Sequence, residues 1–189
     1  LEVAKAYYDI TFKDYAIAMF HPITTEFQDM ALYADQFVDA LLEDQNNYVV
    51  IYPNNDLGSE AIFNAYERLT SHSRFRIFPS VRFEYFLTLL KNSKYIIGNS
   101  SAGIRETPYY GIPAINIGTR QQNRAHHESV IHTDYSKISI LEGIDQALHM
   151  EPIKEDVEFG TGNSADLFLR TLNDNKVWQL SNQKQFLDL

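Results

Sequence analysis

The sequence predicts an α/β protein with a Rossmann-like fold, in which a parallel sheet is covered by helices on both faces. Short apolar runs alternate with longer stretches of helical periodicity along most of the 189 residues. Such runs are typical of parallel strands, which are buried on both sides, and the alternation is typical of strand–helix–strand units. Polar and turn-forming residues follow each run, as expected where a strand leads into a helix.

Six apolar runs mark the expected strands. Five of them are predicted strands of the parallel sheet, the first two of them buried, and the sixth is predicted to be a short strand at the edge of the sheet. The five are residues 15–20, 48–52, 75–78, 95–98 and 114–117, and the edge strand is 130–133.

The segments between these runs have the periodicity of amphipathic helices. Thr24 and Thr25 are candidate N-caps for the first of them. The expected helices cover about 25–43, 59–70, 83–92, 102–110, 137–150 and 164–172. Residues 1–10 are predicted to be a helical or linker lead-in, and the tail through Trp178 and Phe186 is amphipathic.

Composition excludes several classes of partner. The net charge is −9 and the isoelectric point is about 5.0, which argues against a general nucleic-acid or anionic-membrane surface. No apolar run is long enough to span a bilayer, and the absence of cysteine excludes disulfides and thiolate metal sites. We therefore expect a cytoplasmic protein with no nucleic-acid and no membrane partner.

The chain begins at Leu1 rather than at a methionine, and residues 1–8 have the pattern of a helix already under way. We therefore expect the sequence to be part of a longer chain.

The stretch from Tyr95 to Arg120 has the pattern strand, tight turn, helix, strand. Ser100 and Ser101 lie at the turn, where N–H groups at a helix N-terminus and the helix dipole favour an anion such as phosphate. Arg120, at the end of the next strand, can add a bidentate donor to the same anion. A serine at this position is also a common N-cap without a role in binding, so that explanation stays open.

Polar or turn residues follow the carboxyl ends of the expected strands, where open parallel sheets bind their ligands. They are His21, Asn54, Val81 and the segments 99–101 and 118–120. Polar strand ends are ordinary in such a sheet, and a histidine after a buried strand is more often structural. A histidine together with phosphate-type donors is a less ordinary set, and it indicates a candidate ligand site.

Four segments, in order and at suitable spacing, resemble the C-terminal half of the hydrolysing UDP-N-acetylglucosamine 2-epimerases. They are HPITT (21–25), YPNNDLGS (52–59), GNSSAGIRE (98–106) and INIGTRQ (115–121). The Asn-Ser-Ser and Gly-Thr-Arg-Gln forms resemble the hydrolysing enzymes, whereas the non-hydrolysing relatives have an Asp-Ser-Gly-Gly type of turn. The resemblance covers about residues 20–172.

The resemblance implies a two-domain fold of the glycosyltransferase-B type, with the nucleotide sugar between two Rossmann-like domains. Residues 1–189 would form the C-terminal, UDP-binding domain, and the N-terminal domain, which supplies most acid and base groups, would be absent. The implied reaction converts UDP-N-acetylglucosamine to N-acetylmannosamine and UDP, by elimination of UDP and addition of water, at the start of sialic acid biosynthesis. It implies no cofactor and no metal. We expect the full-length protein to be a homo-oligomer, and the isolated chain to bind UDP without epimerase activity.

The resemblance also assigns roles to the polar residues of the Tyr95–Arg120 stretch. Ser100 and Ser101 match residues that hold the diphosphate, and Arg120 matches an arginine beside them. Glu106 matches the carboxylate that accepts hydrogen bonds from the ribose hydroxyls, as a carboxylate can from two hydroxyls at once. Without the resemblance, Glu106 would be an ordinary first-turn acid favoured by the helix dipole.

The remaining implied site residues come from other strand ends. Val81 and Phe86 match positions that flank the uracil, although the pattern alone favours a core role for Phe86. His21 matches an active-site histidine, expected to act in catalysis as a proton donor or by stabilising the leaving diphosphate. Asn54 matches a polar residue lining the cleft.

Three alternatives stay open at this point. The sugar could be UDP-N,N'-diacetylbacillosamine, the protein could be a glycosyltransferase of the same fold, or the chain could be a non-enzymatic nucleotide-sugar binding domain.

His126 and His127 have a metal-like spacing, but adjacent side chains diverge, so we expect a solvated loop there.

Overall fold

Six parallel strands form one open sheet in the order β3-β2-β1-β4-β5-β6. The computed structural model describes residues 1–124, 127–154, 156–157 and 159–180, which fall into two compact units, Leu1–Asp156 and Val157–Leu189. The strands are β1 (Ala16–Met19), β2 (Tyr48–Ile51), β3 (Phe75–Phe78), β4 (Ile96–Gly98), β5 (Ala114–Ile117) and β6 (Val130–Thr133). All six predicted strands are present, and β6 is the predicted edge strand.

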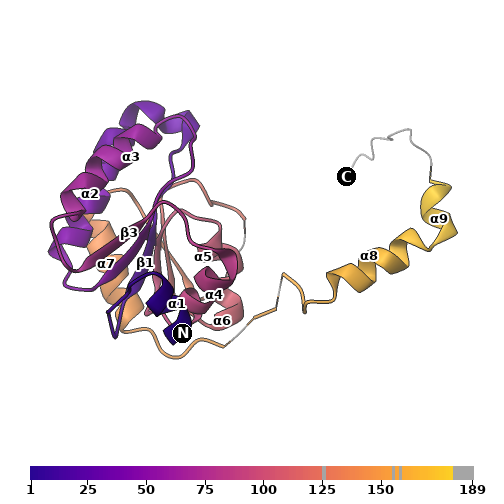
Figure 1. Ribbon diagram of the computed structural model, residues 1–189. Coiled ribbons are helices and arrows are strands. Elements are labelled where there is room, and N and C mark those ends of the chain that lie inside the picture. The colour runs from indigo at the N-terminus through magenta and orange to yellow at the C-terminus, as the bar shows by residue number, and fades with distance from the viewer. Residues whose placement is uncertain (125–126, 155, 158, 181–189) are drawn as a thin grey trace. The chain divides into compact units, whose positions relative to one another are not determined.

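Helices cover both faces of the sheet in the first unit (Figure 1). One face carries α2 (Met30–Glu43), α3 (Ser59–Tyr66) and α7 (Lys137–Leu148). The other carries α1 (Glu2–Tyr7), α4 (Phe83–Lys91), α5 (Ala102–Arg105) and α6 (Thr107–Tyr110). The predicted fold class, a Rossmann-like parallel sheet with helices on both faces, is confirmed.

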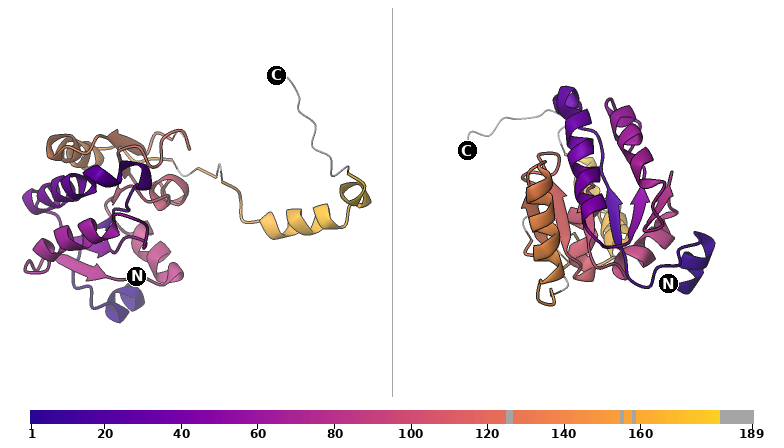
Figure 2. Two further views of the ribbon diagram at one scale, coloured as in Figure 1. Left: turned by 90° about the horizontal axis from the view of Figure 1, so that it is seen from above. Right: turned by 90° about the vertical axis from the view of Figure 1, so that its left-hand side faces the viewer.

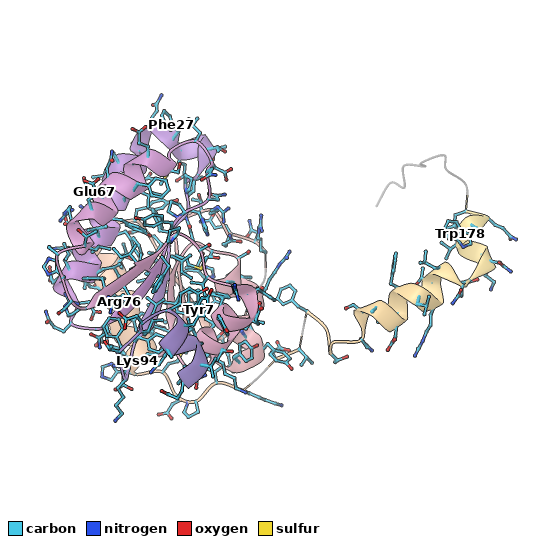
Figure 3. All side chains as sticks on the ribbon, viewed as in Figure 1. Tyr7, Phe27, Glu67, Arg76, Lys94 and Trp178 are labelled. Carbon is cyan, nitrogen blue, oxygen red and sulfur yellow. The ribbon has the colours of Figure 1, made fainter. Side chains whose placement is uncertain are left out.

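Alternate residues of the central strands fill two separate cores. In β1, Ala16 and Ala18 face the core under α2 and α3, while Ile17 faces the core under α4 and α5. Side chains fill the space between the sheet and its helices on both sides (Figure 3). This two-sided burial explains why the strands are almost continuously apolar in sequence.

The helix predicted over 25–43 is two elements. A 3-10 segment, η1 (Thr24–Asp29), precedes α2, and Glu26 within this segment has non-helical dihedrals (φ −119°, ψ 23°). Neither threonine caps α2, which begins at Met30 with no side-chain cap. The prediction of threonine N-caps is therefore wrong, because the chain turns at Glu26 before α2 starts.

The helix predicted over 102–110 is also divided. α5 ends at Arg105, α6 begins at Thr107, and Glu106 lies at the junction. Pro108 causes the break, because it has no N–H to donate to the carbonyl of Ile104 and its ring crowds that carbonyl. The side chain of Thr107 donates to the carbonyl of Gly103 instead (2.7 Å).

The remaining helices of the first unit are close to their predicted ranges. α3 ends at Tyr66 and continues as the 3-10 turn η2 (Glu67–Leu69), so the predicted helix over 59–70 changes type near its end.

Arg74 holds the carboxyl end of α2, since its guanidinium donates to the carbonyls of Leu42 (3.0 Å), Asp44 (2.8 Å) and Asn46 (2.8 Å).

The second unit contains α8 (Ser164–Leu172), which has the predicted range, and α9 (Asn175–Trp178). Figure 2 shows the two helices in further views, and Trp178 is labelled in Figure 3. Phe168 and Trp178 expose 64% and 68% of their surface, which agrees with an amphipathic tail. Phe186 lies outside the described residues. In the part of the chain that the structure describes, no helix combines the length and the apolar character needed to cross a bilayer.

Candidate functional site

A cavity of about 430 Å³ opens at the carboxyl ends of the central strands. Seven predicted site residues line it: His21, Asn54, Val81, Phe86, Ser100, Ser101 and Glu106. Tyr52, Pro79, Ser80 and Phe83 line it as well, and the sequence did not indicate them as site residues. A larger hollow of about 610 Å³ between α2 and α3 contains none of the predicted residues, so we place the candidate site in the smaller cavity.

Asn99 joins three strand ends beneath this cavity. Its side chain is fully buried and bonds the backbone of His21 twice: the His21 amide donates to Oδ1 (2.6 Å), and Nδ2 donates to the His21 carbonyl (2.8 Å). The carbonyl of Asn99 accepts hydrogen bonds from Arg120 Nη1 (3.2 Å) and Gln121 Nε2 (2.9 Å). Asn99 thereby fixes the ends of β1 and β4 and the loop after β5 to one another.

Neither Asn99 nor Gln121 was among the predicted site residues. Both lie within segments that the sequence did single out, but their role depends on partners far away in the chain. Position in the motif was therefore the only signal, and it did not distinguish a residue that binds a ligand from one that holds the site together.

His21 presents a neutral imidazole at the cavity. The backbone amide of Asn54 donates to its Nδ1 (3.1 Å), which assigns the proton of the neutral ring to Nε2. Burial, with a further contribution from the positive charge of Arg120, lowers the pKa of His21 to about 4. At neutral pH His21 is therefore a hydrogen-bond donor through Nε2 rather than a cation.

The turn before α5 is less open to an anion than the sequence predicted. The Ala102 amide donates to Ser100 Oγ (3.3 Å) and the Gly103 amide to the Ser100 carbonyl (3.2 Å), so neither is a free donor. α5 also has only four residues, which leaves little helix dipole. Within the described residues the Ser101 hydroxyl makes no hydrogen bond, and Ser101 lines the cavity, so this hydroxyl is free to donate to a ligand.

Gly98 makes this turn possible. Its φ is +136°, and a Cβ there would lie 1.9 Å from the carbonyl oxygen of Met19 on β1. Only glycine allows the two strands to approach this closely at the floor of the site.

Glu106 reaches the cavity from the break between α5 and α6. Its Oε2 is buried and has no hydrogen-bond partner among the described residues, and burial raises the pKa of its carboxyl group. A buried oxygen without a donor costs stability, and Glu106 Oε2 is therefore free to accept a hydrogen bond.

Apolar side chains form the end of the cavity near α4. Phe86 is 8% exposed and belongs to the core, as the pattern alone favours, and it also lines the cavity wall. Val81 is half-buried beside it. The Tyr8 hydroxyl holds this loop by accepting a hydrogen bond from the Arg82 amide (2.9 Å).

Arg120 does not line the cavity directly, although its guanidinium reaches the Asn99 carbonyl at the cavity floor. Burial lowers the pKa of Arg120, and the carboxylate of Asp56 opposes this shift. Asp56 also accepts a hydrogen bond from the Asn54 side chain. The sequence did not indicate Asp56, which contributes negative charge next to Arg120.

The expectation of a solvated loop at His126 and His127 is wrong for His127, and His126 lies outside the described residues. The His127 side chain is 10% exposed, its Nδ1 lies 2.7 Å from Ser129 Oγ, and its Nε2 lies 3.6 Å from a carboxylate oxygen of Asp156. His127 therefore connects the start of β6 to the end of the first unit. Across the described residues, no group of three or more His, Cys, Asp or Glu side chains is placed to hold a metal ion.

Comparison with known proteins identifies the family. The family model described as UDP-N-acetylglucosamine 2-epimerase matches residues 2–173. The chain belongs to this family. It is 46% identical to a UDP-N-acetylglucosamine 2-epimerase of Neisseria meningitidis serogroup B, over all of this chain and 51% of that protein. It is 27% identical to a UDP-N,N'-diacetylbacillosamine 2-epimerase (hydrolyzing) of Legionella pneumophila, over 82% of this chain and 41% of that protein.

A third relative is the Polysialic acid biosynthesis protein P7 of Escherichia coli, which is 33% identical over 73% of this chain and 36% of that protein. The chain thus spans about half, or less, of the length of these curated relatives.

Solved structures show the same fold. The UDP-GlcNAc 2-epimerase of Methanocaldococcus jannaschii, in complex with UDP-GlcNAc and UDP, matches with a TM-score of 0.72 at 18% identity, over 91% of this chain and 48% of that one. The S. aureus MnaA–UDP co-structure matches with a TM-score of 0.67 at 14% identity, over 96% of this chain and 49% of that one. The predicted fold class, one half of a glycosyltransferase-B type fold, is thereby confirmed.

Proposed function

We propose that this chain is the UDP-binding half of a hydrolysing UDP-N-acetylglucosamine 2-epimerase. The observation that carries the proposal is the composition of the 430 Å³ cavity, which has an apolar end, an unpaired buried carboxylate oxygen and a hydroxyl-rich turn in one continuous hollow. Uracil, ribose and diphosphate present an apolar ring face, hydroxyl donors and an anion, which are complementary to these three features.

Each part of UDP has a partner of suitable chemistry in this arrangement. Val81 and Phe86 flank the base, and Glu106 Oε2 accepts hydrogen bonds from the ribose diol. Ser101, with Ser100 beside it, donates to the diphosphate, and Asn54 also lines the cavity. Arg120 supplies a positive charge at the floor of the site.

The reaction then follows in two balanced steps. A base from the rest of the protein removes the proton at C2 of the sugar while the C1–O bond breaks, and the electron pair leaves with UDP to give an unsaturated sugar. Water then adds across the double bond, with the hydroxyl group on C1 and the proton on the opposite face of C2, which gives N-acetylmannosamine. His21 stabilises the negative charge that develops on the departing diphosphate by donating from Nε2.

Two features favour a hydrolysing enzyme. The turn at 99–101 is Asn-Ser-Ser rather than Asp-Ser-Gly-Gly, and the Legionella pneumophila relative is named as hydrolyzing. The E. coli relative is named for polysialic acid biosynthesis, which agrees with N-acetylmannosamine as a sialic acid precursor. We further propose that an N-terminal domain completes the site in a homo-oligomeric, cytoplasmic protein.

The test is product analysis with the full-length protein and UDP-N-acetylglucosamine in deuterated water. The proposal predicts equal amounts of UDP and free N-acetylmannosamine, with deuterium at C2, and a loss of at least about 100-fold in kcat for His21→Ala. UDP-N-acetylmannosamine without free UDP would indicate a non-hydrolysing enzyme. Turnover of UDP-N,N'-diacetylbacillosamine alone would favour the second candidate, which the Legionella relative supports. Release of UDP only with an acceptor would indicate a glycosyltransferase.

A further inference from the structure

The loop that carries Arg120 is fixed at its start by Tyr135. Gly118 has φ +70°, and its amide donates to the carbonyl of Thr133 on β6 (2.9 Å). The ring of Tyr135 lies against Gly118, because a Cβ at this position would be 2.0 Å from the ring. The backbone that leads to Arg120 is therefore confined between β6 and an aromatic ring.

Glu26 connects this loop to the segment after β1. Its Oε2 accepts a hydrogen bond from the Tyr135 hydroxyl (2.7 Å), and its Oε1 accepts one from the Thr119 hydroxyl. The Thr119 amide donates to the Tyr135 hydroxyl (3.1 Å). Tyr135 in turn stacks on Tyr33 of α2, with ring centroids 3.7 Å apart and planes inclined by 7°. The Glu26 carboxylate and the Thr119 and Tyr135 hydroxyls are thus all hydrogen-bonded, and the ring of Tyr135 is packed on one face by Tyr33.

We propose that Glu26, Thr119 and Tyr135 form a brace that positions Arg120 for the diphosphate. This inference rests on the proposed function. None of the three residues lines the cavity, so they act through Arg120 and not by touching the ligand. Thr119 immediately precedes Arg120, and Glu26 follows His21 by five residues, so the brace links the backbone segment that carries Arg120 to the one that carries His21.

The brace also accounts for the non-helical backbone of Glu26 within η1. Its carboxylate accepts hydrogen bonds from Thr119 and Tyr135, which follow it by 93 and 109 positions in the chain. A helical backbone at Glu26 would direct the side chain away from them. Burial raises the pKa of Tyr135 to about 12, so its hydroxyl remains a donor at neutral pH. A pre-ordered arginine loses less conformational freedom when an anion binds, which increases affinity without a new contact.

The experiment is a double-mutant cycle on the full-length protein, read out as the dissociation constant for UDP. Tyr135→Phe removes one hydroxyl from the brace and keeps the ring over Gly118 and Tyr33. The matched control is Tyr33→Phe, since the Tyr33 hydroxyl makes no hydrogen bond within the described part of the chain. Both substitutions are combined with Arg120→Ala, or with Arg120→Lys should the alanine variant bind too weakly to measure, and Glu26→Gln is measured beside them.

We expect Tyr135→Phe to weaken UDP binding by about three- to ten-fold in the parent protein, as loss of one hydrogen bond should. Without Arg120 the same substitution should change binding less than about two-fold, because coupled residues are not additive. Tyr33→Phe should have little effect in either background, and Glu26→Gln should resemble Tyr135→Phe. An equal loss with and without Arg120, or no loss in the parent, would overturn the brace. If the parent protein itself fails to bind UDP, the proposed function is wrong.

Discussion

Replacing Asn99 by alanine tests whether this buried amide holds the site together. The substitution removes two hydrogen bonds, of 2.6 and 2.8 Å, between the Asn99 side chain and the backbone of His21. Each is worth about 1 kcal/mol, and leaving buried backbone groups without partners adds about 1–3 kcal/mol. We therefore expect the free energy of unfolding to fall by about 3–5 kcal/mol, and UDP binding to weaken at least about ten-fold, because His21 and the serine turn lose their common anchor.

Two further variants separate this role from simple loss of volume. Asn99→Asp keeps the oxygen that accepts from the His21 amide but places an acceptor against the His21 carbonyl, so it should destabilise at least as much as alanine. Asn92→Ala is the matched control, since its side chain makes one exposed hydrogen bond to the Thr88 carbonyl (2.8 Å), and it should change stability by less than about 0.5 kcal/mol.

The measurement is urea unfolding followed by circular dichroism, together with UDP titration of each variant. Equal stability of the Asn99→Ala and Asn92→Ala proteins would refute the reasoning, because the two bonds to His21 would then contribute nothing beyond an exposed contact.

Three other predictions follow from the same structure. The pKa of His21 is lowered to about 4 in the folded chain, below an unfolded value near 6.5, so the unfolded chain binds more protons between these two pH values. The free energy of unfolding should therefore fall as the pH decreases from about 6.5 to 4. The fall should be less steep in His21→Asn, as measured by unfolding at several pH values. Arg74→Ala removes three hydrogen bonds to carbonyls at the end of α2 and should lower the free energy of unfolding in urea by about 2–4 kcal/mol. Arg76→Ala loses an exposed ion pair with Asp9 and should lower it by less than about 1 kcal/mol. Equal losses in the two variants would contradict this prediction. Gly98→Ala places a Cβ 1.9 Å from a backbone oxygen and should lower the melting temperature far more than Gly162→Ala, which also has positive φ but no atom within 4 Å; similar melting temperatures would refute the steric argument.

The sequence predicted the strands well because their burial on both faces leaves a local pattern of apolar residues. β5 and β6 have the predicted bounds, and the strand ends converge where the fold class requires. That convergence is why seven residues, taken from four separate strand ends and helices, could be expected to share one cavity.

What the sequence missed depends on contacts between distant residues. The backbone of Glu26 leaves the helical path to reach Thr119 and Tyr135, and no local pattern around Glu26 predicts this. Asn99 looked like part of a turn, whereas its side chain is committed to His21, 78 positions away. The polar sequence around His127 predicts a solvated loop, whereas the side chain is mostly covered and contacts Ser129 and Asp156.

The break at Glu106 was within reach of sequence reasoning. Pro108 lies inside the helix predicted over 102–110, and proline interrupts the hydrogen bonds of a helix interior. Recognising it would have placed Glu106 at a junction, where its carboxylate can turn toward the cavity.

The most direct test of the central claim is calorimetric titration of the 189-residue chain with UDP, repeated for Ser101→Ala and Arg120→Ala. Ser71→Ala and Arg68→Ala are the matched controls, because both lie on the surface away from the cavity. The account predicts that UDP binds, that each site substitution weakens binding by about 1–3 kcal/mol, and that the controls change nothing. Absence of UDP binding by both this chain and the full-length protein, or equal affinities for site and control variants, would contradict it.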